Sequence, residues 1–241
     1  MKNGAAQTNG KTAMKRRRLM VIMAVAAALG GAAILSNTHS PTQDREKLAR
    51  RHTGEKLLPY WGRSVFIRII KEERVLELWL EHEGSWELFH SYPIAGMSGE
   101  LGPKEQEGDG QAPEGFYRAL PTALNPKSLY YLSFNIGYPN QYDREHGRTG
   151  SHIMVHGSNV SIGCFAMTDA GIEEIYTLVA EALRAGQSYV PVQVYPFRMT
   201  EQRMQKETAS PHYAFWQHLL PGWLHTETHH CPWPDQDNAN S

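Results

Sequence analysis

The sequence predicts a mainly β domain with flanking helices, an α+β fold, and three observations lead to this class. Short runs of β-branched and aromatic residues, separated by turn residues, recur from residue 65 to residue 95 and are typical of a sheet built from hairpins. Apolar residues between Ile172 and Leu183 follow the spacing of a helix, and residues 190–195 alternate as a strand. Hydrophobic residues make up 41% of the 241-residue chain, which is enough for a substantial core.

Strands and loops are expected to alternate along the first part of the domain. Strands over 65–70 and 75–80 are joined by a charged turn. Further strands are expected over 86–89, 92–95, 116–118, 130–134 and 153–155. Residues 96–115 combine many glycines and prolines with acidic residues, and residues 137–150 form a second loop. Because long loops in compact domains usually serve a function, we expect the first loop to be functional.

Three helices are expected. A short one over 43–51 interrupts a polar segment. The second begins at Thr168 and Asp169, which are suitable N-caps, and Gly186 is a natural residue to follow its end. The third begins at 210–211, carries aromatic residues for the core, and is expected to end at 221–222, where proline is followed by glycine.

The N-terminus indicates where the protein acts. An apolar run over 19–35 follows a basic cluster and would measure about 26 Å as a helix. The basic residues are Lys11, Lys15, Arg16, Arg17 and Arg18. They favour a cytoplasmic start, so we expect residues 19–35 to anchor the protein in the inner membrane with the rest in the periplasm. A cleaved signal peptide is the alternative, although no good cleavage site follows.

These features divide the chain into four parts. We expect a basic segment and anchor over 1–35, a linker over 36–62, the main folded domain over 63–222 and a disordered tail over 223–241.

Composition excludes several classes of protein. The net charge of −1 provides no field to attract nucleic acid, and two cysteines are too few for a disulfide scaffold. We expect no metal and no cofactor. His152 and His156 would lie about 13 Å apart along a strand, too far to share a zinc ion. A histidine-rich stretch near Cys231 is only a weak metal candidate.

The strongest chemical signal lies between His156 and Cys164. A buried strand delivers His156, Gly157 follows it, and Ser161, Gly163 and Cys164 come a few residues later. A nearby imidazole is the usual means of activating a thiol, and a glycine leaves backbone N–H groups accessible to a substrate. A helix beginning just after Cys164 would also favour a negative sulfur. Cys164 as a small buried hydrophobic residue is the alternative.

These residues resemble the active-site signature of the YkuD-type L,D-transpeptidase catalytic domain family, and specifically its YafK-like subgroup. The family pattern has His-Gly, a variable loop, then Ser or Thr, a variable residue, Gly and Cys. The stretch over 112–117 resembles the family's Thr-Pro-x-Gly-x-Phe hairpin. The subgroup is similar over 66–69, 76–79, 98–104, 107–109, 133–140, 147–150 and 196–199. The resemblance covers roughly residues 60 to 222 and implies a YkuD-like β-sandwich.

The resemblance also implies roles for individual residues. Cys164 is the nucleophile, His156 is the general base and later the acid, and the Gly157 carbonyl orients the imidazole. Backbone N–H groups of Gly163 and Cys164 form the oxyanion hole. Ser161 is expected to support the loop between His156 and Cys164 and is counted among the substrate-binding residues. Arg148 is our candidate for binding a substrate carboxylate, because its guanidinium suits bidentate binding, and a structural arginine that ties loops together is the alternative. Tyr138 is a weaker candidate of the same kind.

The implied substrate is the peptidoglycan stem peptide, attacked at diaminopimelate through a thioester acyl-enzyme. This sequence has Ile162 and Ala166 where the wider family has His and then Arg or Asn. Transpeptidation is therefore left open against hydrolysis, in which an amidase would release a murein-linked lipoprotein from diaminopimelate. A further alternative, from another class of protein, is a catalytically silent wall-binding module.

Overall fold

The structure is a computed structural model, and it describes residues 41–234. The expected anchor over 19–35 lies outside these residues. None of the helices in the described part of the chain has the length and apolar character needed to cross a membrane.

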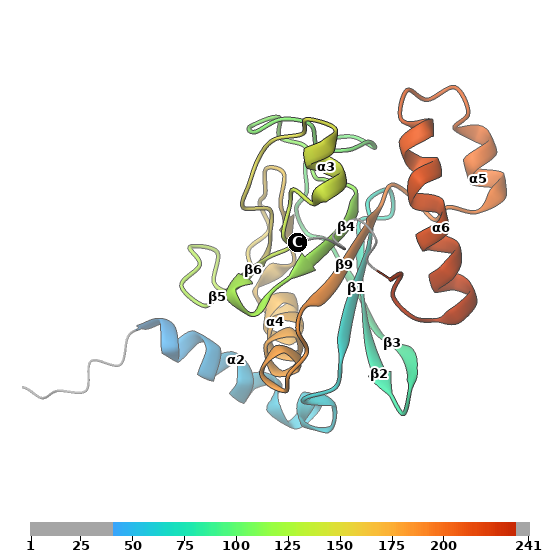
Figure 1. Ribbon diagram of the computed structural model, residues 1–241. Helices are drawn as coiled ribbons and strands as arrows, with labels where there is room; N and C mark the ends of the chain where they lie inside the picture. Colours follow the sequence, from blue (N-terminus) through green and yellow to red (C-terminus); the bar gives the residue numbers. More distant parts are fainter. Residues whose placement is uncertain (1–40, 235–241) are drawn as a thin grey trace, which may run out of the picture. The chain divides into compact units, whose positions relative to one another are not determined.

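The larger sheet has five strands in the order β3-β2-β1-β9-β4 (Figure 1). Its strands are β1 Val65–Ile70, β2 Val75–His82, β3 Ser85–Pro93, β4 Gly115–Ala119 and β9 Val190–Tyr195. β1 pairs antiparallel with β2 and parallel with β9. All six residues of β1 are buried, because this strand lies in the middle of the sheet and is covered on both faces.

The smaller sheet has four short strands in the order β5-β6-β7-β8. They are β5 Leu124–Asn125, β6 Ser133–Asn135, β7 Met154–His156 and β8 Phe165–Ala166. Asn135 pairs with Met154, and Val155 pairs with Phe165 in parallel register. Because side chains alternate between the faces of a sheet, Val155 and Phe165 point into the core, while Met154 and His156 share the opposite face.

Two hydrophobic clusters lie on opposite faces of the larger sheet. The first joins this sheet to the smaller sheet and to the amphipathic helix α4 Thr168–Arg184. The second joins it to α5 Glu201–Lys206 and α6 Tyr213–His229, the helix pair drawn in red in Figure 1. The expected α+β class is therefore confirmed, with two sheets and helices on both sides.

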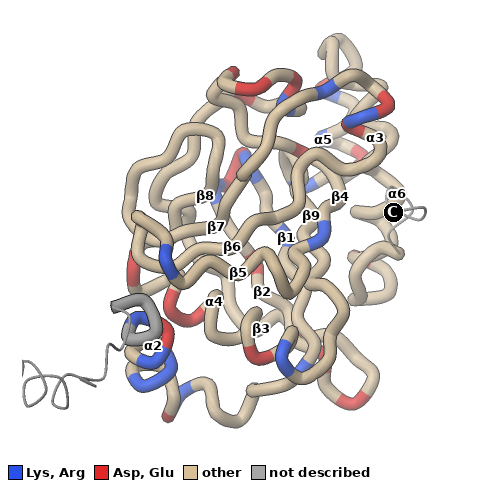
Figure 2. The backbone as a smooth tube through the Cα atoms, turned by 60° about the vertical axis from the view of Figure 1, so that its left-hand side comes forward, with Lys and Arg blue, Asp and Glu red and all other residues tan. Residues whose placement is uncertain are grey.

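The N-terminal helix is longer than the sequence predicted. α2 covers Pro41–Leu57 and is followed by the 3-10 turn Leu58–Tyr60, where the sequence indicated only 43–51. Lys and Arg residues gather on α2 (Figure 2). Lys56 and His52 pair with acidic residues of α4, and Ala49 is fully buried. Residues 41–60, which the sequence analysis assigned to a linker, are thus packed against the domain.

The last helix also extends beyond its predicted end. α6 continues through Pro221 to His229, although proline removes one helical hydrogen bond. Trp223 and Thr226 are buried, and Thr226 lies 3.3 Å from the Gln193 amide oxygen of β9. Packing against the sheet therefore outweighs the Pro-Gly stop signal, and the expected disordered tail is helical over its first residues. α3 Gln141–Glu145, within the second loop, was not predicted.

Candidate active site

His156 ends β7 and is buried beneath a turn that requires glycine. The chain turns sharply at Gly157, where a Cβ atom would lie 2.6 Å from the Asp169 carboxylate and 2.7 Å from the Tyr130 carbonyl oxygen. The ring of Tyr130 covers the imidazole at a centroid distance of 4.8 Å. His156 is consequently only 3% exposed.

One backbone contact fixes the orientation of the imidazole. Nδ1 of His156 lies 2.6 Å from the carbonyl oxygen of Gly157. A carbonyl oxygen can only accept, so Nδ1 carries the proton and Nε2 presents its lone pair. Burial lowers the pKa of His156, and the Gly157 carbonyl opposes this shift only in part. The imidazole is therefore neutral near pH 7 and has the protonation state of a base.

The thiol of Cys164 lies on the backbone of the neighbouring strand. Its Sγ accepts a hydrogen bond from the Met154 N–H at 3.3 Å and donates to the His152 carbonyl oxygen at 3.6 Å. Burial raises the pKa of the thiol, and three weaker influences oppose this: the Met154 N–H, the Ser161 hydroxyl and the charge of Lys104. Burial around the sulfur therefore favours the thiol form, opposite to the effect expected from its place before a helix.

Ser161 lies next to the imidazole. Its hydroxyl oxygen is 3.4 Å from Nε2 of His156, and its hydroxyl is one of the influences that oppose the effect of burial on the pKa of the Cys164 thiol. Within residues 41–234, the structure records no direct hydrogen bond between Sγ and the imidazole. The sequence analysis gave Ser161 a supporting role in the loop and did not predict its contact with Nε2.

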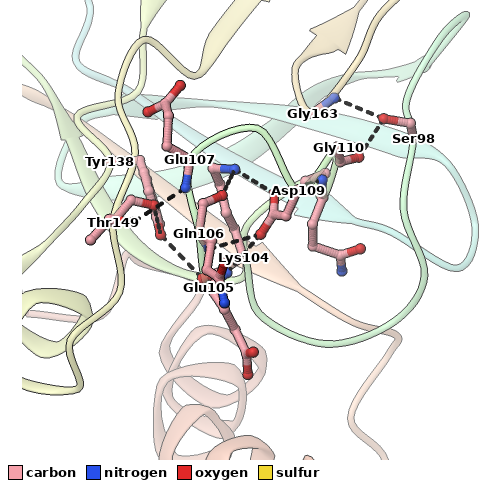
Figure 3. Close-up of polar contacts among 12 residues, drawn as sticks. Ser98, Lys104, Glu105, Gln106, Glu107, Asp109, Gly110, Tyr138, Thr149 and Gly163 are labelled. Atoms are coloured by element: carbon pink, nitrogen blue, oxygen red, sulfur yellow. Dashed lines mark hydrogen bonds and ion pairs between the residues drawn. The ribbon is translucent and has the colours of Figure 1, made fainter.

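Gly163 makes the turn into Cys164 and contacts a residue that the sequence argument did not single out. Its φ of +78° is the left-handed conformation that glycine adopts most readily. Its N–H, expected in the oxyanion hole, instead donates to the hydroxyl of Ser98 at 2.8 Å (Figure 3). That hydroxyl donates in turn to the Gly110 carbonyl. The Gly163 N–H is therefore already hydrogen-bonded within the protein.

The long loop over 96–115 is ordered and borders the site. At its base, Nζ of Lys71 donates to the carbonyl oxygens of Gly102 and Ala112 and to the Glu114 carboxylate at 2.8–2.9 Å. Burial lowers the pKa of Lys71, and Glu114 opposes this shift by its charge and hydrogen bond. This buried pair fastens both ends of the loop to the core.

A second ion pair holds the tip of this loop. Lys104 pairs with the Asp109 carboxylate, which also accepts three backbone N–H bonds from 105, 106 and 111 (Figure 3). Burial disfavours the carboxylate, but these hydrogen bonds outweigh it and lower the pKa of Asp109 to about 2. The Asp109 carboxylate is therefore ionised at neutral pH and can hold the tip.

Arg148 and Tyr138, which the sequence analysis proposed for substrate binding, make contacts with other residues inside the domain. Arg148 forms an ion pair with the buried Asp143 at 2.8 Å and lies over the ring of Phe215. The Tyr138 hydroxyl lies 3.1 Å from the Lys104 carbonyl oxygen and the residue is 4% exposed. These contacts supply a structural role for both residues and do not support a role in gripping substrate.

No group of three or more metal-ligating side chains occurs in the described part of the chain. In the C-terminal stretch, Nε2 of His225 lies 3.1 Å from the sulfur of Cys231, and the two residues form a pair only.

The smaller sheet and the loop after it thus hold a thiol, a neutral imidazole and a hydroxyl that contacts this imidazole. The model of the YkuD family, the L,D-transpeptidase catalytic domain, matches residues 64–217. The chain therefore belongs to the L,D-transpeptidase catalytic-domain family.

Among individual relatives, the chain is similar to a protein of Escherichia coli strain K12 named "Putative L,D-transpeptidase YafK". The two are 40% identical over 214 residues, which is 89% of this chain and 84% of the relative. The corresponding protein of Escherichia coli O157:H7 matches equally well. The expected subgroup is thus confirmed.

Two solved structures are more distant. The helical cell shape determining protein Pgp2 of Campylobacter jejuni is 22% identical with a TM-score of 0.46, and the match covers 63% of this chain and 55% of that structure. L,D-transpeptidase 1 of Mycobacterium tuberculosis is 14% identical with a TM-score of 0.30, over 55% of this chain and 62% of that structure.

Proposed function

We propose that the chain is a periplasm-facing cysteine enzyme that cleaves peptidoglycan stem peptides at diaminopimelate through a thioester on Cys164. The proposal rests on the contacts around His156: Nδ1 is held by the Gly157 carbonyl, and Nε2 lies 3.4 Å from the Ser161 hydroxyl on the loop that leads to Cys164. Family membership supplies the class of reaction and makes peptidoglycan the natural substrate.

The first half-reaction follows from this arrangement. The Cys164 thiol passes its proton to Nε2 of His156, with Ser161 as the connecting hydroxyl, and the sulfur attacks the amide carbonyl. The C–N bond then breaks, the imidazolium returns the proton to the departing amine, and the acyl group remains on sulfur as a thioester. Because the pKa of His156 is lowered, the imidazolium is a strong enough acid to protonate that amine.

The second half-reaction depends on the acceptor. An amine that attacks the thioester gives a new cross-link, whereas water gives hydrolysis; in both cases His156 takes a proton from the acceptor and the thiol is restored. Hydrolysis is the second candidate function, and it would release a lipoprotein joined to diaminopimelate. It is favoured by Ile162, which is 83% exposed beside the site and offers no hydrogen bond to hold an amine acceptor.

Intact-protein mass spectrometry tests the acyl-enzyme. The full chain is incubated with muropeptides, with and without an attached lipoprotein peptide, and the masses of the protein and of the products are measured. We expect an adduct with wild-type protein and with Cys231→Ala, a matched control because that cysteine lies far along the chain, and none with Cys164→Ala.

The products then decide between the candidate reactions. Free diaminopimelate ends indicate hydrolysis, and new cross-linked species indicate transfer. A folded wild-type protein that binds peptidoglycan but forms neither adduct nor product would contradict the proposal in favour of a silent wall-binding module.

A further inference from the structure

A buried hydroxyl on β6 lies next to the proposed base, and the reaction scheme above does not use it. It belongs to Ser133, which is 1% exposed. Its Oγ is one of four buried side-chain polar atoms in the described part of the chain that have no hydrogen-bond partner. A hydroxyl that is removed from water without gaining a partner destabilises the fold, and such groups are uncommon in proteins. The position of Ser133 therefore calls for an explanation.

The register of the smaller sheet places this hydroxyl beside the imidazole. Ser133 lies directly opposite His156 in the antiparallel pair of β6 and β7. One step along, the Gly157 N–H donates to the Leu132 carbonyl oxygen at 3.1 Å, so these two residues form a hydrogen-bonded pair. Hydrogen-bonded and non-hydrogen-bonded pairs alternate along an antiparallel sheet, so Ser133 and His156 form the non-hydrogen-bonded kind. In that kind the side chains approach most closely, with Cβ atoms about 4.5–5.5 Å apart.

Both side chains lie on the same face of this sheet. The next residue of β6, Phe134, is fully buried in the first hydrophobic cluster, so Ser133 points to the opposite face, as His156 does. The ring of Tyr130 covers the imidazole, and both Ser133 and His156 are almost inaccessible to solvent. The hydroxyl and the imidazole are thus enclosed together.

Ser133 does not carry the proton in this arrangement. Nδ1 of His156 bonds the Gly157 carbonyl, and Nε2 faces Ser161. Ser133 hydrogen-bonds neither nitrogen, so its hydroxyl can act on the ring only through its dipole and a C–H contact. When Nε2 takes the proton of the thiol, the ring becomes a cation in a site where burial lowers its pKa. A hydroxyl can rotate to turn its oxygen toward that positive charge, and the low local dielectric constant strengthens the attraction.

We propose that Ser133 is a positioning residue for the reaction at Cys164, and that its hydroxyl turns its oxygen toward the His156 ring while the ring holds the proton of the thiol. No bond to Ser133 is made or broken, and no proton leaves it. The inference deepens the proposed function and rests on it, because it concerns the imidazolium formed in the first half-reaction.

Ser133→Ala tests the inference, because alanine keeps the small size of the side chain and removes only the oxygen. The titration of the His156 ring protons is followed by NMR in the full chain, and kcat/KM for muropeptides is measured against pH. Since the hydroxyl stabilises the imidazolium, its loss should lower the pKa of His156. We expect the midpoint of the titration and the acid limb of kcat/KM to move down by about 0.5–1 pH unit, and the plateau of kcat/KM to fall about three- to tenfold. Stability to urea should be unchanged or higher, because an unpaired buried hydroxyl is gone.

Two further variants serve as controls. Thr177→Val removes another buried hydroxyl that has no partner in the described part of the chain. This hydroxyl lies about 14 Å along α4 from the first residue of that helix, so its loss should leave the titration of His156 unchanged. Ser133→Thr keeps a hydroxyl at the same strand position and should keep the wild-type midpoint.

The results also distinguish the two proposals from each other. An unchanged His156 midpoint in folded Ser133→Ala would overturn the inference and leave the proposed function standing, and so would a shifted midpoint with unchanged kcat/KM. Failure of Ser133→Ala to fold would contradict the inference as well, because removal of an unpaired hydroxyl should not destabilise the protein. If the midpoint moves as expected but wild-type protein forms neither adduct nor product with muropeptides, the proposed function is wrong, while the effect of Ser133 on the imidazole stands.

Discussion

Replacement of Lys71 by methionine should destabilise the protein by about 3–5 kcal/mol, because it leaves a buried carboxylate without its counter-ion. The side chain of Lys71 is 1% exposed and that of Glu114 is 0% exposed. Nζ of Lys71 supplies hydrogen bonds to Glu114 and to the carbonyl oxygens of Gly102 and Ala112.

The size of the expected destabilisation follows from the contacts that Glu114 keeps when Lys71 is replaced. Methionine is close to lysine in length and shape, so little cavity is created. The Glu114 carboxylate keeps the Gly102 N–H at 2.7 Å and the Trp216 indole N–H at 2.8 Å, but loses its one ammonium partner. Breaking a buried pair in this way costs about 3–5 kcal/mol. For a domain of this size, such a loss lowers the melting temperature by about 6–20 °C.

Urea unfolding of the full chain, followed by tryptophan fluorescence, measures the effect. Lys71→Met combined with Glu114→Gln should recover a large part of the loss, because the uncompensated charge is then gone. Lys56→Met is a matched control: its ion pair with Glu174 is exposed, and its loss should cost less than about 1 kcal/mol. A loss below about 1 kcal/mol for Lys71→Met alone would refute the reasoning.

Four further outcomes are expected. Ser161→Ala should lower kcat/KM by about a hundredfold or more if its hydroxyl carries the proton between thiol and imidazole; a drop of tenfold or less, with unchanged alkylation of the thiol, would show that it only supports the loop. When the rate of Cys164 labelling by iodoacetamide is measured against pH, the midpoint of its rise should lie at a higher pH than for an ordinary cysteine, because the pKa of this thiol is raised. The acid limb of kcat/KM should lie below the usual histidine range, because a lowered pKa keeps His156 neutral to lower pH; an acid limb above pH 6.5 would contradict this. Arg148→Met should lower the free energy of unfolding by about 3 kcal/mol, because Asp143 is left buried and unpaired; a large rise in KM at unchanged stability would instead restore its role in binding.

Local patterns predicted the elements that position the site. The alternation of apolar residues around Val155 and the glycine after His156 specify a strand that ends in a turn, and the structure has both. The helix after Cys164 was also predicted correctly: Thr168 accepts from the Gly171 N–H, while Asp169 accepts from the Ser158 N–H instead of capping the helix. These signals involve residues that are close together in the sequence, so one sequence is enough to predict the elements.

Contacts between distant segments could not be predicted in the same way. Ser98 reaches Gly163 across 65 positions, and nothing in its own neighbourhood indicates that contact. The continuation of α6 past Pro221 depends on the buried faces of Trp223 and Thr226 against the sheet, which outweigh local helix propensity. Arg148 was a candidate for substrate binding because its guanidinium suits bidentate binding, with a structural role as the alternative; the sequence could not decide between them, and its ion pair with Asp143 becomes visible only in three dimensions.

The partner of the His156 imidazole is the main chain at Gly157. In many catalytic centres the partner of the histidine is a carboxylate or amide side chain, which a single amino-acid substitution can remove. Here the backbone sets the tautomer, and every residue type at position 157 keeps the carbonyl that accepts the proton. A bulkier residue at 157 removes the contact only by rerouting the turn, because its Cβ atom would meet Asp169 and Tyr130, and such a change would disturb the fold at the same time.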